Sequence, residues 1–225
     1  MSLIEAWPAL AAVVPAAERE MAERALRAPL LSACDEDLAL TLAADIDGAF
    51  DFLVLNGIVL KETVLATRGA LELLGPGDVL GPPLSALRQV ESRAVSRYLA
   101  HGPVTLATLD GRFRLAARRW PELSLVLHDS LARQTHRASM HLAMLHLPRI
   151  EDRIVALFGD LAERFGRMTP AGAVIDLDLT HEVIGRLVAS RRPTVTIALQ
   201  ALAEDGRLVR REDAAWVLQP GAVAP

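Results

Sequence analysis

Cysteine and lysine are almost absent from the 225-residue sequence. Cys34 is the sole cysteine, so no internal disulfide can form, and one thiol cannot by itself build a thiolate metal site. Lys61 is the sole lysine among 24 basic residues, an arginine excess that a GC-rich genome explains. The sequence also lacks an uninterrupted apolar run of membrane-spanning length and an N-terminal secretion signal. These absences predict a cytoplasmic protein with no membrane partner.

The composition that remains is that of a folded protein. Apolar residues make up 52% of the chain, and its length suits one large domain or two small ones. The net charge of −4 disfavours a protein that is basic all over, but it leaves room for a local basic patch that binds nucleic acid.

The N-terminal half changes from helical to strand-like patterning. Charged and apolar residues alternate with helical spacing over 16–31, and the acidic stretch that begins at Cys34 could start another short helix. Turn signals such as Asn56–Gly57 and Gly75–Pro76–Gly77–Asp78 then separate short apolar runs, a pattern typical of a small β-barrel or sandwich. The expected strands lie near 50–55, 58–65 and 70–74 and within 101–116.

A long helix is predicted to follow Pro121, which suits a first helical turn. One line of residues recurs at spacings of four and three, the period of coiled-coil contact. This seam favours packing against a second copy of the chain; the alternative is a helix buried against the barrel. The seam comprises Leu127, Leu131, Gln134, Ala138, His141 and Leu145. Pro148 ends the pattern, and a second amphipathic helix follows up to a plausible cap at Gly166. After a loop, residues 175–179 alternate as a short strand would.

Two short helices joined by a tight break are predicted over 179–206. Thr180 is a good N-cap residue, and Gly185 would let another helix approach closely. The break at Ala189–Ser190 precedes a second helix that begins near Arg191, with Pro193 in its first turn. This is a helix-turn-helix, and the apolar runs on either side of Glu212–Asp213 predict a two-stranded wing.

Arginines gather in this region. In a helix-turn-helix the start of the second helix reaches base edges in the major groove, where arginine pairs with guanine O6 and N7. Two acidic residues, Glu204 and Asp205, accompany six arginines over 186–211, which leaves a local excess of four positive charges. The alternative is a solvated helix start in a winged helix that binds protein. The arginines are Arg186, Arg191, Arg192, Arg207, Arg210 and Arg211.

Three stretches resemble the CRP/FNR family of bacterial transcription regulators. LGPGDVLG is similar to the barrel motif of the family's sensor domain, and the stretch 141–166 to its dimer helix and hinge. The stretch 179–209 is similar to its DNA-binding signature over the whole length. The resemblance implies an α+β fold: a double-stranded β-helix (jelly-roll-like) barrel over 1–120, a dimerisation helix over 121–147, and a winged helix-turn-helix over 148–225. It further implies a homodimer on two-fold double-stranded DNA, with RNA polymerase and an unidentified small-molecule effector as partners.

The resemblance also assigns residues to DNA. Thr180 and His181 stand where the family contacts phosphates, and Arg192 keeps its guanine-reading arginine. Pro193 and Ile197 replace a frequent glutamate and a frequent arginine, so the family's usual recognition sequence is not expected. The expected DNA-binding residues are Thr180, His181, Ser190, Arg191, Arg192, Thr194, Thr196, Arg210 and Arg211.

The sensor motif departs from that of cyclic-nucleotide-binding members. Gly81 is followed by Pro82 rather than by glutamate, and Ser92–Arg93 reverses the order of the phosphate-binding pair. We therefore expect no tight binding of cyclic AMP or cyclic GMP, with Arg93 the one candidate for an effector contact. Cys34 alone cannot hold an iron–sulfur cluster. A haem- or gas-sensing regulator that uses a histidine such as His128 or His136 remains an alternative.

Other motifs indicate no catalytic or metal site. The stretch HEVIG begins like a zinc-protease motif, but Gly185 stands where the second histidine would be. Histidines at 136, 141 and 146 are five residues apart, whereas two metal ligands on one helix face need a spacing of three or four. The sequence thus predicts a DNA-binding regulator that is not an enzyme and has no cofactor. A ligand-binding or protein-interaction module whose winged helix no longer reads DNA is the rival.

Overall fold

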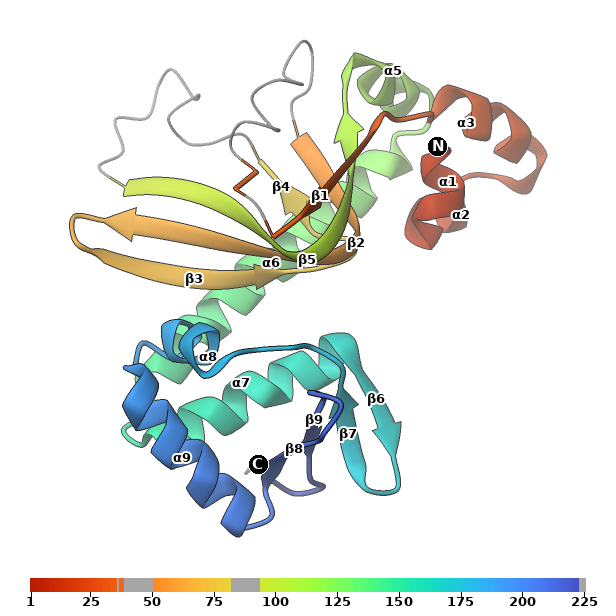
Figure 1. The fold of residues 1–225 in the computed structure, drawn as a ribbon. Coiled ribbons are helices and arrows are strands. Elements are labelled where there is room, and N and C mark those ends of the chain that lie inside the picture. Colours follow the sequence, from red (N-terminus) through yellow and green to blue (C-terminus); the bar gives the residue numbers. More distant parts are fainter. Residues whose placement is uncertain (36, 39–50, 82–93, 223–225) are drawn as a thin grey trace. The chain divides into compact units, whose positions relative to one another are not determined.

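The computed structural model describes residues 1–35, 37–38, 51–81 and 94–222 (Figure 1). The chain divides into two compact units, Met1–His136 and Arg137–Pro225, and each is described here by itself. None of the described helices is both long enough and apolar enough to cross a membrane.

The first unit begins with short helices rather than one long one. The helix expected over 16–31 ends at Ala25, because Pro29 lacks an N–H and disfavours helical backbone before it. Cys34 closes strand β1 instead of starting a helix. The N-terminal helices bury Leu3, Leu10 and Leu26 against Phe113 and Trp120. The elements are α1 (Leu3–Ala6), α2 (Pro8–Val13), the 3₁₀ helix η1 (Ala16–Glu18), α3 (Arg19–Ala25) and β1 (Leu30–Cys34).

The first unit is a β domain, because it is built around an antiparallel sheet. The strand order in this sheet is β1-β5-β2-β3, with β4 beside β2. The two strands expected on either side of Asn56–Gly57 are one strand. Its register against β5 shifts at Asn56, so this dipeptide makes an irregularity within the strand rather than a hairpin turn. Gly57 is required there, because its φ is +83° and a Cβ would lie 2.1 Å from the Pro103 carbonyl oxygen. The strands are β2 (Asp51–Leu65), β3 (Arg68–Leu74), β4 (Val79–Leu80) and β5 (Ala94–Leu109).

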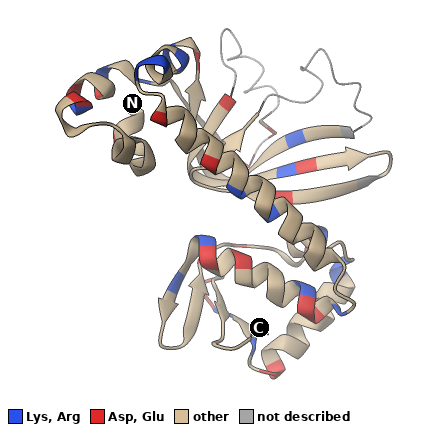
Figure 2. Ribbon diagram, turned by 180° about the vertical axis from the view of Figure 1, so that it is seen from behind, with Lys and Arg blue, Asp and Glu red and all other residues tan. Residues whose placement is uncertain are grey.

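Residues of opposite charge lie next to one another on these strands (Figure 2). Lys61 Nζ is 3.3 Å from Glu72 Oε2 across β2 and β3, and Arg97 pairs with Glu62 across β5 and β2. The Gly75–Asp78 segment is a turn, as expected, and its Gly75 N–H donates to Asp78 Oδ2 at 2.9 Å.

Residues 111–116, which the sequence predicts as strand, belong to helix α5 (Gly111–Arg119). Asp110 is its N-cap, and Asp110 Oδ1 accepts from the Arg112 and Phe113 N–H groups at 2.9 and 3.3 Å. A capping aspartate followed by glycine reads equally well as a hairpin turn, which explains the wrong prediction.

The long helix expected after Pro121 is α6 (Glu122–Leu145), and it crosses the boundary between the units. Two of its side chains bind the turn before β4 and the first residue of β4. The Ser130 hydroxyl donates to the Gly77 carbonyl oxygen at 2.5 Å, and the Gln134 amide bonds to both the N–H and the carbonyl of Val79 at 3.1 Å. Gln134, expected on the seam, therefore faces its own domain. Leu131 and Leu142 are 48% and 62% exposed.

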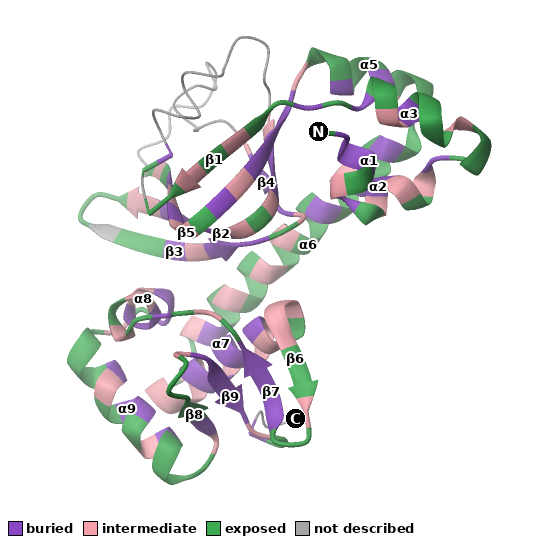
Figure 3. Cartoon of the chain, turned by 45° about the vertical axis from the view of Figure 1, so that its right-hand side comes forward, coloured by how far each residue is buried: buried purple, intermediate pink, exposed green. Residues whose placement is uncertain are grey.

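The second unit is a helical domain with a small sheet in the order β6-β7-β9-β8. Its core includes Phe158, whose ring centroid lies 5.0 Å from that of Trp216. Residues 175–179 are not the expected separate strand: Ile175 ends β7, and coil leads from there to Thr180. Figure 3 shows β7 and β9 buried. The elements are α7 (Ile150–Phe165), β6 (Gly166–Thr169), β7 (Gly172–Ile175), α8 (His181–Leu187), α9 (Arg192–Glu204), β8 (Leu208–Arg210) and β9 (Trp216–Leu218).

Candidate nucleic-acid interface

Helix α8 begins as the sequence predicts. Thr180 is its N-cap, and Thr180 Oγ1 accepts from the Val183 N–H at 3.2 Å. A Cβ at Gly185 would lie 3.5 Å from Val195 Cγ2 of the second helix, as expected of a close helix approach, and only 2.8 Å from the Ser190 carbonyl oxygen of the turn. This glycine lets the turn after α8 fold back against the helix.

The turn between the helices is tight. The Ser190 N–H donates to the Gly185 carbonyl oxygen at 2.8 Å, and Ala189 has a left-handed φ of +51°. Arg153 of α7 contacts the same turn, because its Nη1 donates to the Val188 carbonyl oxygen at 3.4 Å. Its Nε donates to the Leu147 carbonyl oxygen, just before α7, at 2.7 Å. A single arginine inside an amphipathic helix carries no sequence signal for this contact with the turn.

Helix α9 starts at Arg192, one residue after the predicted start, and Arg191 is its N-cap. Pro193 lies in the first turn, where it removes an N–H that has no partner within the helix. One face of the helix is buried and the other is open to solvent (Figure 3). The buried residues are Val195, Ala198, Leu199 and Leu202, and the exposed residues of the first two turns are Arg192, Pro193, Thr194 and Ile197.

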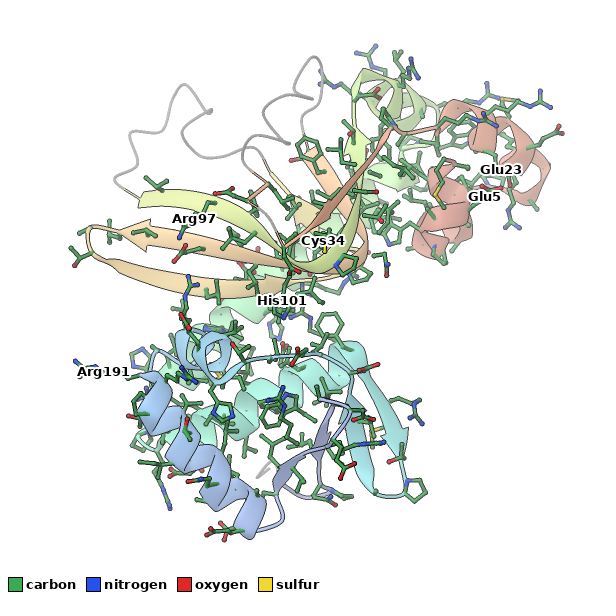
Figure 4. All side chains as sticks on the ribbon, viewed as in Figure 1. Glu5, Glu23, Cys34, Arg97, His101 and Arg191 are labelled. Atoms are coloured by element: carbon green, nitrogen blue, oxygen red, sulfur yellow. The ribbon has the colours of Figure 1, made fainter. Side chains whose placement is uncertain are left out.

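The two arginines at the start of α9 are available to a ligand. Arg191 and Arg192 are exposed, and neither forms an ion pair with any residue that the structure describes. Figure 4 shows the Arg191 side chain pointing away from the helix into solvent. They lie at a helix N-terminus, whose free N–H groups and dipole attract phosphate.

His181 connects the first turn of α8 to α9. Its Nδ1 is 2.9 Å from Thr196 Oγ1, and the same hydroxyl donates to the Arg192 carbonyl oxygen at 3.0 Å. Burial lowers the pKa of His181 below its ordinary value of 6.5, and the positive charges of Arg210 and Arg192 lower it further. The imidazole is thus held among cations at the surface predicted to meet phosphates.

The predicted wing is present as strands β8 and β9, but its arginines are not free. Arg210 Nη2 lies 2.7 Å from Asp178 Oδ1, and its guanidinium lies 5.4 Å from the Trp216 ring centroid. Arg211 Nη2 lies 2.9 Å from Asp213 Oδ2. The sequence could not reveal the pairing with Asp178, because 32 residues separate the two partners.

The candidate sensor residues Pro82, Ser92 and Arg93 lie outside the described residues. His128 and His136 are both exposed on α6. Within the described part of the chain, no group of three or more His, Cys, Asp or Glu side chains is placed to hold a metal ion.

The second unit is a helix-turn-helix with a wing and a basic helix start, and a β domain precedes it in the sequence. This is the arrangement of a DNA-binding transcription regulator. The family model of the Crp-like helix-turn-helix domain matches residues 152–222 of this chain. The regulatory protein CysR of Synechococcus elongatus is 33% identical over 159 residues, which are 69% of this chain and 69% of CysR.

Two further comparisons agree. The CRP-like cAMP-activated global transcriptional regulator of Mycobacterium tuberculosis is 31% identical over 65% of this chain and 62% of its own length. A solved CRP/FNR-family regulator from Thermus thermophilus shares the fold, with a TM-score of 0.57 and 21% identity over 85% of this chain and 94% of that one. The chain belongs to the CRP/FNR family of DNA-binding transcriptional regulators.

Proposed function

We propose that the protein binds a two-fold DNA site as a homodimer and reads one half-site with each α9. The observation that carries this proposal is the pair of exposed arginines at the start of α9, Arg191 and Arg192, free of ion pairs with the described residues. Arg192 reads a guanine, and Arg191 and the Thr180 end of α8 hold phosphates. Arg210 and Arg211 contribute phosphate contacts from the wing once DNA competes with Asp178 and Asp213.

Selection from a random duplex pool tests this proposal. The enriched sequence should be a palindrome whose half-sites lie about one helical turn, roughly 34 Å, apart. Affinity for it should reach about 10⁻⁸ M or tighter and fall linearly with log salt concentration. A winged helix that binds protein instead would enrich no duplex.

Arg192→Ala should weaken binding to the selected site by about 1–3 kcal/mol and relax the preference at one base pair. Its affinity for unrelated duplexes should change far less. Arg211→Ala is the matched control, because a phosphate contact weakens binding to all sequences alike and lowers the salt slope by about one. Competitive fluorescence anisotropy across all single-base variants measures both patterns. Equal loss on all sequences for both variants contradicts the assignment.

We propose α6 as the dimer contact, within the three-part organisation of 1–120, 121–147 and 148–225. Leu131, Ala138 and Leu142 are all exposed and fall within about 40° around the helix axis, since each residue turns it by 100°. Such a stripe matches the period of helix pairing. We further propose that the dimer acts in the cytoplasm with RNA polymerase as a partner.

The proposed effector is a small molecule other than a tightly bound cyclic nucleotide. Cyclic AMP activates the Mycobacterium tuberculosis relative by its name, and this chain has Pro82 and a reversed Ser92–Arg93 in the corresponding motif. Calorimetry with cyclic AMP and cyclic GMP should show no micromolar affinity. Heat release that fits such an affinity would contradict this proposal.

A further inference from the structure

Ile197 is a large apolar side chain that the fold of α9 does not use. It is 68% exposed, whereas the apolar residues that attach the helix to its domain are nearly inaccessible. Isoleucine is also an unfavourable choice for an open helix position, because its branched β-carbon loses rotamer freedom there. Neither core packing nor helix propensity accounts for this residue. The buried set comprises Val195 at 0%, Ala198 at 1%, Leu199 at 6% and Leu202 at 0% exposure.

The position of Ile197 on the helix is informative. It follows Pro193 by four residues, so the two side chains are neighbours one turn apart on the exposed face. Pro193 is exposed as well and carries no hydrogen-bonding side chain. Thr194 borders the pair, and Arg192 begins the same helix. An apolar ridge thus lies on the surface that presents the arginines.

Resting on the proposed placement of α9 in the major groove, we propose that Ile197 contacts the 5-methyl group of a thymine. Thymine alone among the four bases presents a methyl group in that groove. Cytosine would place its N4 amino group against isoleucine, which offers no acceptor, so a desolvated donor would be left unsatisfied. Ile197 therefore selects a T·A pair within each half-site, beside the guanine assigned to Arg192.

Removing the methyl group from the DNA tests this contact directly. In the duplex recovered by selection, each thymine is replaced singly by deoxyuridine, which keeps every hydrogen-bonding group and lacks the methyl. One thymine in each half-site should weaken binding of the unaltered protein about fourfold when replaced, the equivalent of one buried methyl-sized group. Ile197→Ala should bind the thymine duplex more weakly and show no further loss with deoxyuridine.

A matched control comes from the same domain. Met168 of β6 is 75% exposed, and β6 lies on the opposite side of the domain from α9 (Figures 1 and 3). Met168→Ala should keep the affinity and the fourfold deoxyuridine effect of the unaltered protein. Because Ile197 is outside the core and alanine is the better helix former, Ile197→Ala should not lower the melting temperature, so any loss of affinity arises at the DNA.

Two results overturn the contact while leaving DNA binding intact. In the first, the unaltered protein tolerates deoxyuridine at every position. In the second, Ile197→Ala loses as much affinity with deoxyuridine as the unaltered protein does, so another residue meets the methyl. Enrichment of no duplex at all is a different result, because it contradicts the proposed function itself.

Discussion

His181 lies in an electrostatic setting that DNA would reverse. In the free protein, burial and then Arg210 and Arg192 lower its pKa, so the neutral imidazole is favoured. A DNA phosphate beside it would raise the pKa again, because a negative charge stabilises the imidazolium. Binding should therefore take up a proton.

The consequence is an opposite pH response of stability and affinity. The pKa of His181 in the folded protein lies below its ordinary value of 6.5. The stability that its neutral side chain contributes to the fold is therefore fully present above pH 6.5 and is lost as the pH falls through the lower pKa of the folded state. Affinity for the operator should instead rise as the pH falls through this range, because the bound state takes up the proton. Anisotropy titrations measure it, and His181→Asn should abolish most of the pH response. An unchanged response in that variant would place the proton elsewhere.

The residue assignments show what a sequence can reveal about this site. The positions of Thr180, Arg191 and Arg192 at the starts of helices were predictable, because caps and first turns have local signatures in the sequence. The bond between His181 and Thr196 and the ion pair of Arg210 with Asp178 were not. Both join residues on different elements, so they depend on how the helices and the wing pack.

At the scale of elements, the turn between α8 and α9 contains a residue whose backbone conformation is strained. Ala189 adopts a φ of +51°, which a residue with a Cβ adopts reluctantly. Ala189→Gly should remove that strain and raise the free energy of unfolding by about 0.5–1 kcal/mol.

Ala198→Gly in the middle of α9 is the matched control, and it should lower stability by about 1 kcal/mol or more, since glycine is a poor helix former and Ala198 is buried. Urea denaturation measures both. Equal destabilisation by the two substitutions would show that the turn bears no strain.

The helices of the second unit were more predictable than the strand pairing of the β domain. The amphipathic period of α7 and the break before α9 mark each helix locally, and both were predicted within a few residues. In the β domain, Asn56–Gly57 favours a tight turn by itself. Pairing of β2 with β5 on both sides of it overrides that preference and makes it an irregularity in one strand.

At the scale of the whole molecule, α6 belongs to both units, since the division falls after His136. Its hydrogen bonds to Gly77 and Val79 attach its first half to the β domain. A dimer built on this helix would therefore join two copies through the element that the two units share.

The double substitution Leu131→Glu with Leu142→Glu should convert the dimer to monomers, because it places carboxylates of both copies in an apolar contact. Sedimentation velocity measures the mass, and loss of operator binding should accompany the change. His136→Glu is the control: it adds a negative charge to the same helix, one where the double substitution adds two, and it projects about 140° from Leu131 around the helix axis. A dimer that survives the double substitution would exclude this stripe as the contact.

Cys34 closes β1 with an exposed thiol and is the chain's sole cysteine. A maleimide fluorophore would therefore attach at one known position per copy of the native sequence, with no engineered background. Mixing donor-labelled with acceptor-labelled protein would then follow the exchange of subunits in real time by energy transfer.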